Sequence, residues 1–203
     1  MFKLLRLVFT CLAICGAFIL GGILQDRNTL SDEVIRLHVV AASDSEADQA
    51  VKLQIRDAVV AQLNEKMAEF PTAADAKVFL AAHLTDIEDV ANGVLEKAGF
   101  ADRATVNFDR EAFDTRVYDT FTLPAGVYES LRIVVGDGHG KNWWCVVFPG
   151  LCIPQTEDDF AGAAVGAGFS ETLTQTIGNE EGYEVRFFIL DCLGRLQNLF
   201  HKS

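Results

Sequence analysis

Residues 34–48 read VIRLHVVAASDSEAD, and this stretch predicts a β-strand that leads directly into a helix. Its first nine residues are mostly apolar or β-branched, with Arg36 and His38 alternating on one side, as in strands that have one polar face. A serine followed three residues later by an acidic residue occurs twice after residue 42, and this spacing is typical of a capping box. Apolar residues at helical spacing then extend to about Phe70, where Pro71 disfavours further helix.

The rest of the chain alternates between helical and strand patterns. Helices are expected to begin near Thr72 and at Thr85, the second ending at Gly99. Strands are expected at residues 104–109, 115–123, 130–135, 142–148 and 183–190, further helices at 170–177 and 192–200, a linker at 25–33 and a loop at 154–168. The first two strands are predicted to form a hairpin, and the next two another hairpin around the glycine-rich loop 136–140.

Segregated helices and mostly hairpin-linked strands are typical of an α+β fold. We therefore predict an N-terminal apolar helix followed by an antiparallel or mixed sheet with helices packed on one face. The predicted organisation is a signal peptide or membrane anchor with its linker at residues 1–28, and a single α+β signalling domain at residues 29–203.

The N-terminal segment predicts export. Residues 7–24 carry no charge, and this run is just long enough to span a bilayer as a helix. Lys3 and Arg6 precede it, which keeps the N-terminus in the cytoplasm and places the body outside. The same layout fits an uncleaved anchor, with membrane contact through residues 7–24, or a cleaved signal peptide. The remaining alternative is a buried core helix of a soluble protein.

The charge balance restricts the partners. With 17 basic and 29 acidic residues, the chain has a formal net charge of −12. Nucleic acids and anionic lipid surfaces bind clustered Lys and Arg, so we expect neither as a partner.

Export makes the cysteines of the body informative. Cys145 and Cys152 flank the turn formed by Phe148, Pro149 and Gly150, so an oxidising exterior permits a disulfide between them. The alternative is that both remain buried free thiols. Cys192 is the third cysteine of the body.

Patterns that would indicate catalysis or metal binding are incomplete. The histidines are too widely spaced for a zinc peptidase motif, and GDGHGK at residues 136–141 lacks the Ser or Thr and the following helix of a phosphate-binding loop. Asp44 begins a calcium-loop spacing that is not completed. Cys145 with His139 is the remaining nucleophile and base pair, without a visible third group. We expect no enzyme activity, no cofactor and no metal.

The segment Asn142-Trp143-Trp144 follows the glycine-rich loop. Because neighbouring residues of a strand point to opposite faces, the two tryptophans separate onto the two sides of the sheet. Exposed tryptophan beside polar residues is typical of a protein-binding hot spot. The alternative is that both rings simply fill the core.

Several segments together resemble the stage II sporulation protein R family. The strongest is GHGKNWWCVVFP at residues 138–149, followed by Leu151 and Cys152; residues 35–39, 42–45, 123–129 and 185–188 are also similar. The resemblance covers most of residues 34–192. Ala41-Ala42 stands where the family has Ala-Asn, and Gly150 replaces a second proline, so local loop details differ.

This resemblance implies a function that composition alone does not. Members are exported from the forespore into the space between the forespore and mother-cell membranes. There they act on a membrane-embedded aspartic protease of the mother cell, which then cleaves the precursor of the mother-cell sigma factor. The body is expected in that intermembrane space, secreted or anchored on the outer face of the cytoplasmic membrane.

We predict that one surface of the body contacts this protease. Its predicted residues are Ser43, Asp44, Tyr128, Lys141, Asn142, Trp143 and Trp144. Two alternatives from other classes are a secreted cysteine-dependent hydrolase and a non-catalytic structural module of the envelope.

Overall fold

The computed structural model describes residues 2–67, 69–149, 157–178 and 184–201. The helices are α1 (Phe2–Glu33), α2 (Glu46–Met67), α3 (Ala73–Ala82), α4 (Leu84–Lys97), α5 (Glu157–Gly166), α6 (Glu171–Ile177) and α7 (Glu184–Asn198). The strands are β1 (Ile35–Val40), β2 (Ala104–Phe113), β3 (Arg116–Val117), β4 (Thr122–Leu123), β5 (Gly126–Val135) and β6 (Asn142–Phe148). The predicted α+β class, with an N-terminal apolar helix and a mixed sheet, is confirmed.

A mixed sheet of four strands, in the order β2-β5-β1-β6, forms the centre of the body. β1 runs parallel to β5 and antiparallel to β6, while β2 runs antiparallel to β5. All six residues of β1 are buried. A strand buried on both faces is stable with a neighbour on each side, which accounts for the central position of β1.

Both predicted hairpins are wrong. β2 pairs with β5 from Ala104 opposite Val135 to Phe113 opposite Gly126, and the segment expected to pair with β2 forms a separate ribbon of β3 and β4. β5 and β6 flank the glycine-rich loop, but β1 lies between them. Hairpin reasoning considers only the turn and its two flanking segments, whereas the buried strand β1 makes backbone hydrogen bonds to both β5 and β6.

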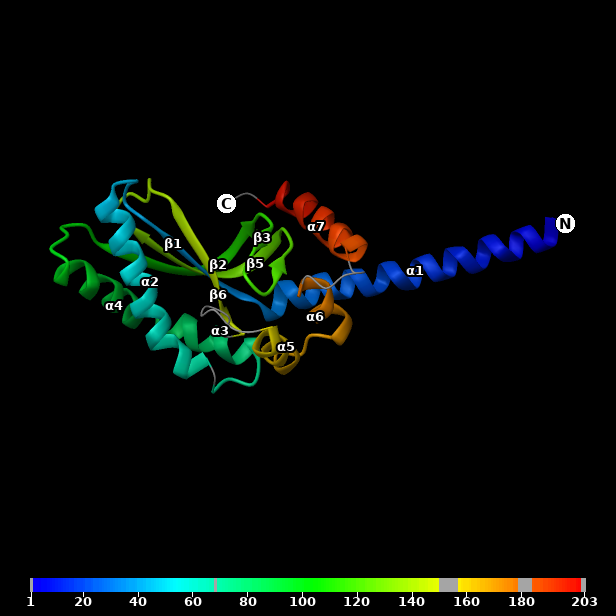
Figure 1. Ribbon diagram of the computed structural model, residues 1–203, viewed down its shortest axis with the longest axis horizontal. Helices are drawn as coiled ribbons and strands as arrows, with labels where there is room; N and C mark the ends of the chain where they lie inside the picture. Colours follow the sequence, from blue (N-terminus) through cyan, green and yellow to red (C-terminus); the bar gives the residue numbers. More distant parts are fainter. Residues whose placement is uncertain (1, 68, 150–156, 179–183, 202–203) are drawn as a thin grey trace.

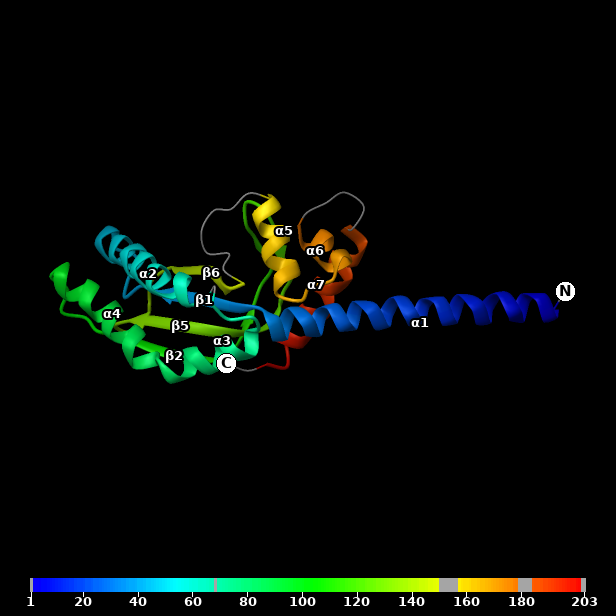
Figure 2. The same cartoon turned by 90° about the horizontal axis from the view of Figure 1, so that it is seen from below.

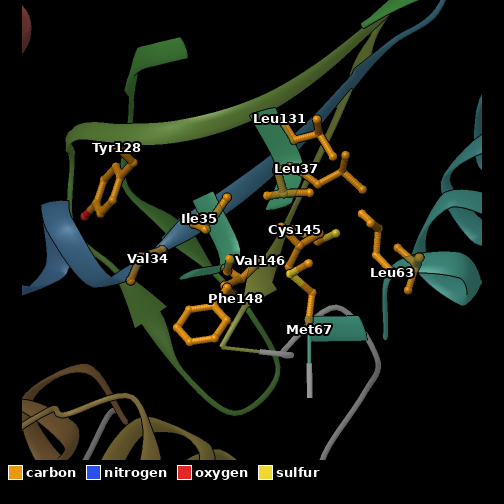
Figure 3. Packing of buried hydrophobic residues seen from close by; sticks show 14 of the residues in the cluster. Val34, Ile35, Leu37, Leu63, Met67, Tyr128, Leu131, Cys145, Val146 and Phe148 are labelled. Atoms are coloured by element: carbon orange, nitrogen blue, oxygen red, sulfur yellow. The ribbon is translucent and has the colours of Figure 1, made fainter. Parts of the chain in front are cut away.

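The apolar core lies on the helix-covered face of the sheet. α2 contacts β1 and β6, and α4 contacts β2. Leu37, Leu131 and Cys145 occupy matching positions on three adjacent strands. Figure 3 shows these side chains together with Leu63 and Met67, which come from α2.

The helix starts follow the capping pattern of the sequence. The Ser45 hydroxyl accepts from the backbone N–H of Asp48 at 3.1 Å, so the second of the two capping candidates is the one used. α3 begins near Thr72 as predicted, and the Thr72 hydroxyl caps it, accepting from Asp75 N–H at 3.2 Å. These side chains satisfy amides that have no partner in the first turn of a helix.

The C-terminal part of the chain differs from the prediction. Residues 183–190 were predicted as a strand and 192–200 as a helix, but α7 is a single helix. The aromatic and β-branched side chains there favour a strand by propensity. Within the described residues Leu190 is fully buried whereas Val185 and Phe188 are exposed, so one side of a helix packs on the body instead. α5 likewise replaces the predicted loop over residues 157–166.

α1 projects from the body as one continuous rod, and its N-terminus is far from the sheet (Figure 1). It is long and apolar enough to cross a membrane. The linker predicted at residues 25–33 is instead the last part of this helix, because Ile23 and Leu30 are buried against the body. Figure 2 shows the same rod leaving the body beside α7.

Candidate functional site

The glycine-rich loop docks on the end of β1. The N–H of Gly140 donates to the carbonyl of Ala41 at 2.9 Å, and that of His139 donates to the carbonyl of Ala42 at 3.2 Å. A Cβ atom on Gly140 would lie 2.3 Å from the carbonyl oxygen of Ser43, which only glycine avoids. The loop therefore brings Lys141 beside the turn that starts α2.

Ser43, Asp44 and Lys141 meet at this turn, as the sequence predicted. The backbone N–H of Lys141 donates to the Asp44 carboxylate at 2.7 Å. The Ser43 hydroxyl donates to the carboxylate of Asp48 and accepts from the N–H of Ser45 at 3.1 Å. Asp44 is exposed and Ser43 is half-buried.

Lys52 binds the backbone of Lys141 from the other side and was not identified from the sequence. Its ammonium group donates to the carbonyl of Lys141 at 3.0 Å and to the Gln49 side chain at 2.6 Å. Burial lowers the pKa of Lys52, and Lys141 and Arg56 lower it further, although Asp44 opposes them. A lysine between the apolar residues Val51 and Ile55 of a helix was the available signal.

The two tryptophans lie on opposite faces of β6, as expected. Trp143 is 36% exposed, and the Arg56 guanidinium from α2 lies 4.4 Å from its ring centroid. Trp144 is half-buried, with the guanidinium of Arg116 from β3 only 3.6 Å from its ring centroid. Each ring is therefore covered by an arginine from a different element, which fixes its orientation through a cation–π contact.

β6 is an edge strand of the described sheet. From Cys145 onward its side chains are buried, whereas Asn142 and Trp143 are exposed and Trp144 is half-buried. The exposed and half-buried residues around this edge form a surface that we call the tryptophan edge. It consists of Ser43, Asp44, Lys141, Asn142, Trp143 and Trp144.

A polar network lies behind the tryptophan edge. His38 Nδ1 lies 2.9 Å from Glu111 Oε1, and His38 Nε2 lies 3.0 Å from Asn142 Oδ1. The imidazole also stacks on Trp144, with 5.5 Å between ring centroids. Ser130 donates to Glu111 at 2.9 Å. The network supports both Asn142 and Trp144 from below.

Glu111 is the charged centre of this network, and sequence reasoning missed it together with Ser130. Burial disfavours its ionisation, but the hydrogen bonds from His38 and Ser130 and the electrostatic influence of His38 and Arg132 outweigh burial. The pKa of Glu111 therefore lies below its ordinary value.

This arrangement is unlike that of a hydrolase. Both ring nitrogens of His38 are occupied by Glu111 and Asn142, and the Ser130 hydroxyl points to Glu111. Cys145 lies on the opposite face and is disulfide-bonded, so it has no free thiolate for nucleophilic attack. Cys152, its predicted partner, lies outside the described residues. The described residues also contain no group of three or more side chains suited to hold a metal ion.

The structure does not bring Tyr128 to the predicted contact surface. It is 2% exposed, and its hydroxyl donates to the Pro124 carbonyl at 2.7 Å. Burial raises the pKa of the Tyr128 hydroxyl above its ordinary value. Its ring lies 5.3 Å from the fully buried guanidinium of Arg36, so Tyr128 is part of the interior. The apolar pattern of residues 126–135 was the missed signal.

Fold and site together describe an α+β domain that is carried on an apolar helix and presents an aromatic, polar surface on an edge strand. Residues 31–158 match the family model of stage II sporulation protein R. The chain belongs to this family, whose members are sporulation signalling proteins.

A curated relative supports the assignment. The chain is 32% identical over 185 residues to stage II sporulation protein R of Bacillus subtilis (strain 168), covering 82% of this chain and 83% of that protein. No solved structure matches the chain.

Proposed function

We propose that this chain is an exported signal that activates a membrane-embedded aspartic protease of the mother cell. The activated protease cleaves the inactive precursor of the mother-cell sigma factor. Three observations support the proposal: the family match, the N-terminal apolar helix and the disulfide-bonded state of Cys145. The last observation argues against the cysteine-dependent hydrolase.

The tryptophan edge carries the proposal, because it combines exposure with a fixed geometry. Trp143 is exposed beside the polar residues Lys141 and Asn142, and buried aromatic anchors dominate the affinity of many protein interfaces. Among the described strands, β6 has a neighbour only on the β1 side, so its outer backbone can pair with an extended segment of a partner. We propose that the protease supplies such a segment and a pocket for the Trp143 ring.

Activation then follows from differential affinity. A signal shifts its receptor toward the active arrangement only by binding that arrangement more tightly than the resting one. Moving a receptor from almost fully resting to almost fully active requires about 5 kcal/mol of such preference. One buried tryptophan with its flanking backbone bonds supplies a large part of that energy.

We also propose that α1 remains attached as an anchor in the forespore membrane, with the body in the intermembrane space. Ile23, Asp26 and Leu30 are buried against the body, so the end of the apolar helix is part of the folded domain. Lys3 and Arg6 stay on the cytoplasmic side. Anchoring keeps the tryptophan edge within a short distance of the facing membrane.

Reconstitution tests the proposal. The chain, its cognate protease and the sigma factor precursor are co-expressed in non-sporulating cells, and precursor cleavage is followed on a gel. Trp143→Ala is expected to abolish cleavage while export and folding persist. Val78→Ala, which shortens a more exposed apolar side chain on α3, away from the tryptophan edge, is the control and retains cleavage.

Normal cleavage by an exported, folded Trp143→Ala variant would show that another surface docks. Absence of cleavage with the unmodified chain, despite a functional protease, would refute the activation itself. The structural-module alternative predicts this second result.

A further inference from the structure

α7 has an exposed apolar face that the proposed contact with the protease does not use. Val185 is 73% exposed, Phe188 65%, Leu196 53% and Leu199 77%. Together with the exposed Cys192 they follow one another at intervals of three or four residues. Those within α7 therefore lie on one side of the helix, and Leu199, in the turn that follows directly, continues the stripe. A soluble surface seldom exposes such a continuous stripe without a partner.

The opposite side of α7 is fixed to the body, so the stripe cannot turn inward. Leu190 is fully buried. The Asp191 carboxylate accepts from the N–H of Ala125 at 2.8 Å. A Cβ atom on Gly194 would lie 1.6 Å from the Ala125 carbonyl oxygen, so the backbone of α7 lies directly against that turn.

The first turn of α7 is fixed to α1 at the point where the apolar run ends. Arg186 Nε donates to the Asp26 carboxylate at 2.9 Å, and Asp26 is 7% exposed. The uncharged run of residues 7–24 ends two positions before Asp26. In Figures 1 and 2, α7 lies at the end of the body from which α1 emerges, and it crosses the direction of α1.

We propose that this stripe lies on the lipid surface beside the point where α1 leaves the bilayer. The inference rests on the proposed anchoring by α1. An amphipathic helix held at this level buries its apolar side between the headgroups and the acyl chains. Continuity with the membrane-spanning run of α1 favours lipid over a second copy or a protein partner. Two contacts with the membrane, through α1 and α7, then fix the orientation of the body relative to the bilayer.

The charge of the chain specifies the kind of lipid surface. With a formal net charge of −12, the protein gains little from anionic lipid, so the contact is apolar. Vesicles of zwitterionic phosphatidylcholine are therefore sufficient, and added anionic lipid does not strengthen the contact.

Fluorescence quenching in phosphatidylcholine vesicles tests the inference with the full chain. Cys11→Ser and Cys15→Ser leave Cys192 as the thiol for an environment-sensitive fluorophore, since Cys145 is disulfide-bonded. A matched chain carries the same fluorophore on the exposed α4 position through Glu96→Cys, with all three free cysteines replaced by serine. In a third chain, Cys11 and Cys192 are replaced by serine, so that Cys15 within α1 carries the fluorophore.

The emission of the Cys192 fluorophore is expected to shift to the blue, to be quenched by brominated lipid and to lose quenching by aqueous iodide. The fluorophore at the Glu96→Cys position should show no blue shift and no quenching by brominated lipid, and it should remain quenched by iodide. Phe188→Gln combined with Leu196→Gln should restore iodide quenching at Cys192. Val117→Gln, at an exposed apolar position on β3, should not.

Equal iodide quenching at Cys192 and at the α4 position would overturn the inference. If Cys15 is protected by lipid in that experiment, the anchor stands and only the α7 contact fails. If Cys15 is not protected, the anchor itself fails. Protection of Cys192 that depends on protein density, with energy transfer between copies, would assign the stripe to a second copy and also overturn the inference.

Discussion

The two faces of the central sheet are buried in different ways. The face covered by α2 and α4 carries the fully buried side chains of Leu37, Leu131 and Ile133. The other face carries Arg36 and His38 from the same strand β1, and both are buried among aromatic rings and a carboxylate. The first face is stabilised mainly by apolar burial, which is non-directional. The second depends on specific partners, because a buried polar group without them is costly.

This difference also relates the fold to the proposed site. The network of His38, Glu111 and Asn142 lies directly behind Trp144 and the exposed end of β6. A purely apolar face would hold a strand in place without fixing the orientation of its surface side chains. The polar face thus provides a rigid support for the tryptophan edge.

Of the proposed substitutions, replacing Arg36 is expected to destabilise the polar face the most. Its guanidinium lies 3.9 Å from the Phe113 ring centroid and donates to the Tyr118 hydroxyl at 2.9 Å. Arg36→Ala leaves a cavity there and is expected to cost about 4 kcal/mol of unfolding free energy, in the range for large buried side chains. Chemical unfolding of the full chain in mild detergent, followed by tryptophan fluorescence, measures the loss.

The Arg36→Met variant separates the effect of losing side-chain volume from the effect of losing the charge. Within the described residues Arg36 Nε and Nη1 have no hydrogen-bond partner. A methionine fills much of the same space without a buried charge, so its stability should lie within about 1 kcal/mol of the unmodified chain. If Arg36→Met loses as much as Arg36→Ala, the charge itself is required and the two faces differ even more than we infer.

Substituting Trp143 and Trp144 in turn compares the two faces of the sheet on a single strand. Trp144→Ala removes the stacking on His38 and the contact with Arg116 and should cost about 2–3 kcal/mol, somewhat less than for a fully buried ring. Trp143→Ala removes an exposed ring and should cost about 1 kcal/mol or less. Chemical unfolding followed by circular dichroism gives both values. Equal losses would contradict the unequal roles of the two rings.

Glu111 is expected to produce an effect between those of Trp144 and Trp143, and one that depends on pH. Because its pKa in the folded state lies below the ordinary value of 4.5, the carboxylate stabilises the fold above that value. This stabilisation is lost as the pH falls through the lowered pKa. Glu111→Gln should therefore cost about 2 kcal/mol near neutral pH, the scale of a hydrogen bond to a charged group.

Unfolding measured across a pH series checks this prediction. The stabilities of the Glu111→Gln variant and the unmodified chain should converge at acidic pH. Glu96→Gln, on the exposed surface of α4, serves as the control and should match the unmodified chain throughout. A constant difference at all pH values would mean that Glu111 acts through packing rather than charge.

Local signals predicted many elements of the fold correctly. The strand at β1, the cap at Ser45 and the helix start near Thr72 all depend on residues close in sequence. The opposite faces of Trp143 and Trp144 follow from strand geometry alone. Predictions failed where a distant segment decided the outcome, as for the insertion of β1 between β5 and β6.

The candidate site shows the same limit. Glu111 and Ser130 belong to strands far along the chain from His38, and no spacing rule joins them. Tyr128 was predicted to lie on the contact surface, whereas it packs beneath Arg36. Lys52 was overlooked because charged residues on a helix are usually solvated.

By itself, the sequence determined the apolar N-terminal helix, the α+β class, the family and the Asn-Trp-Trp stretch, because each depends on composition or on side chains a few positions apart. Only the tertiary structure decided the strand order, the polar network behind Trp144 and the helical state of residues 184–198. Those features depend on which distant surfaces bury one another. Burial free energy is a property of the packed pair of surfaces and not of either segment alone.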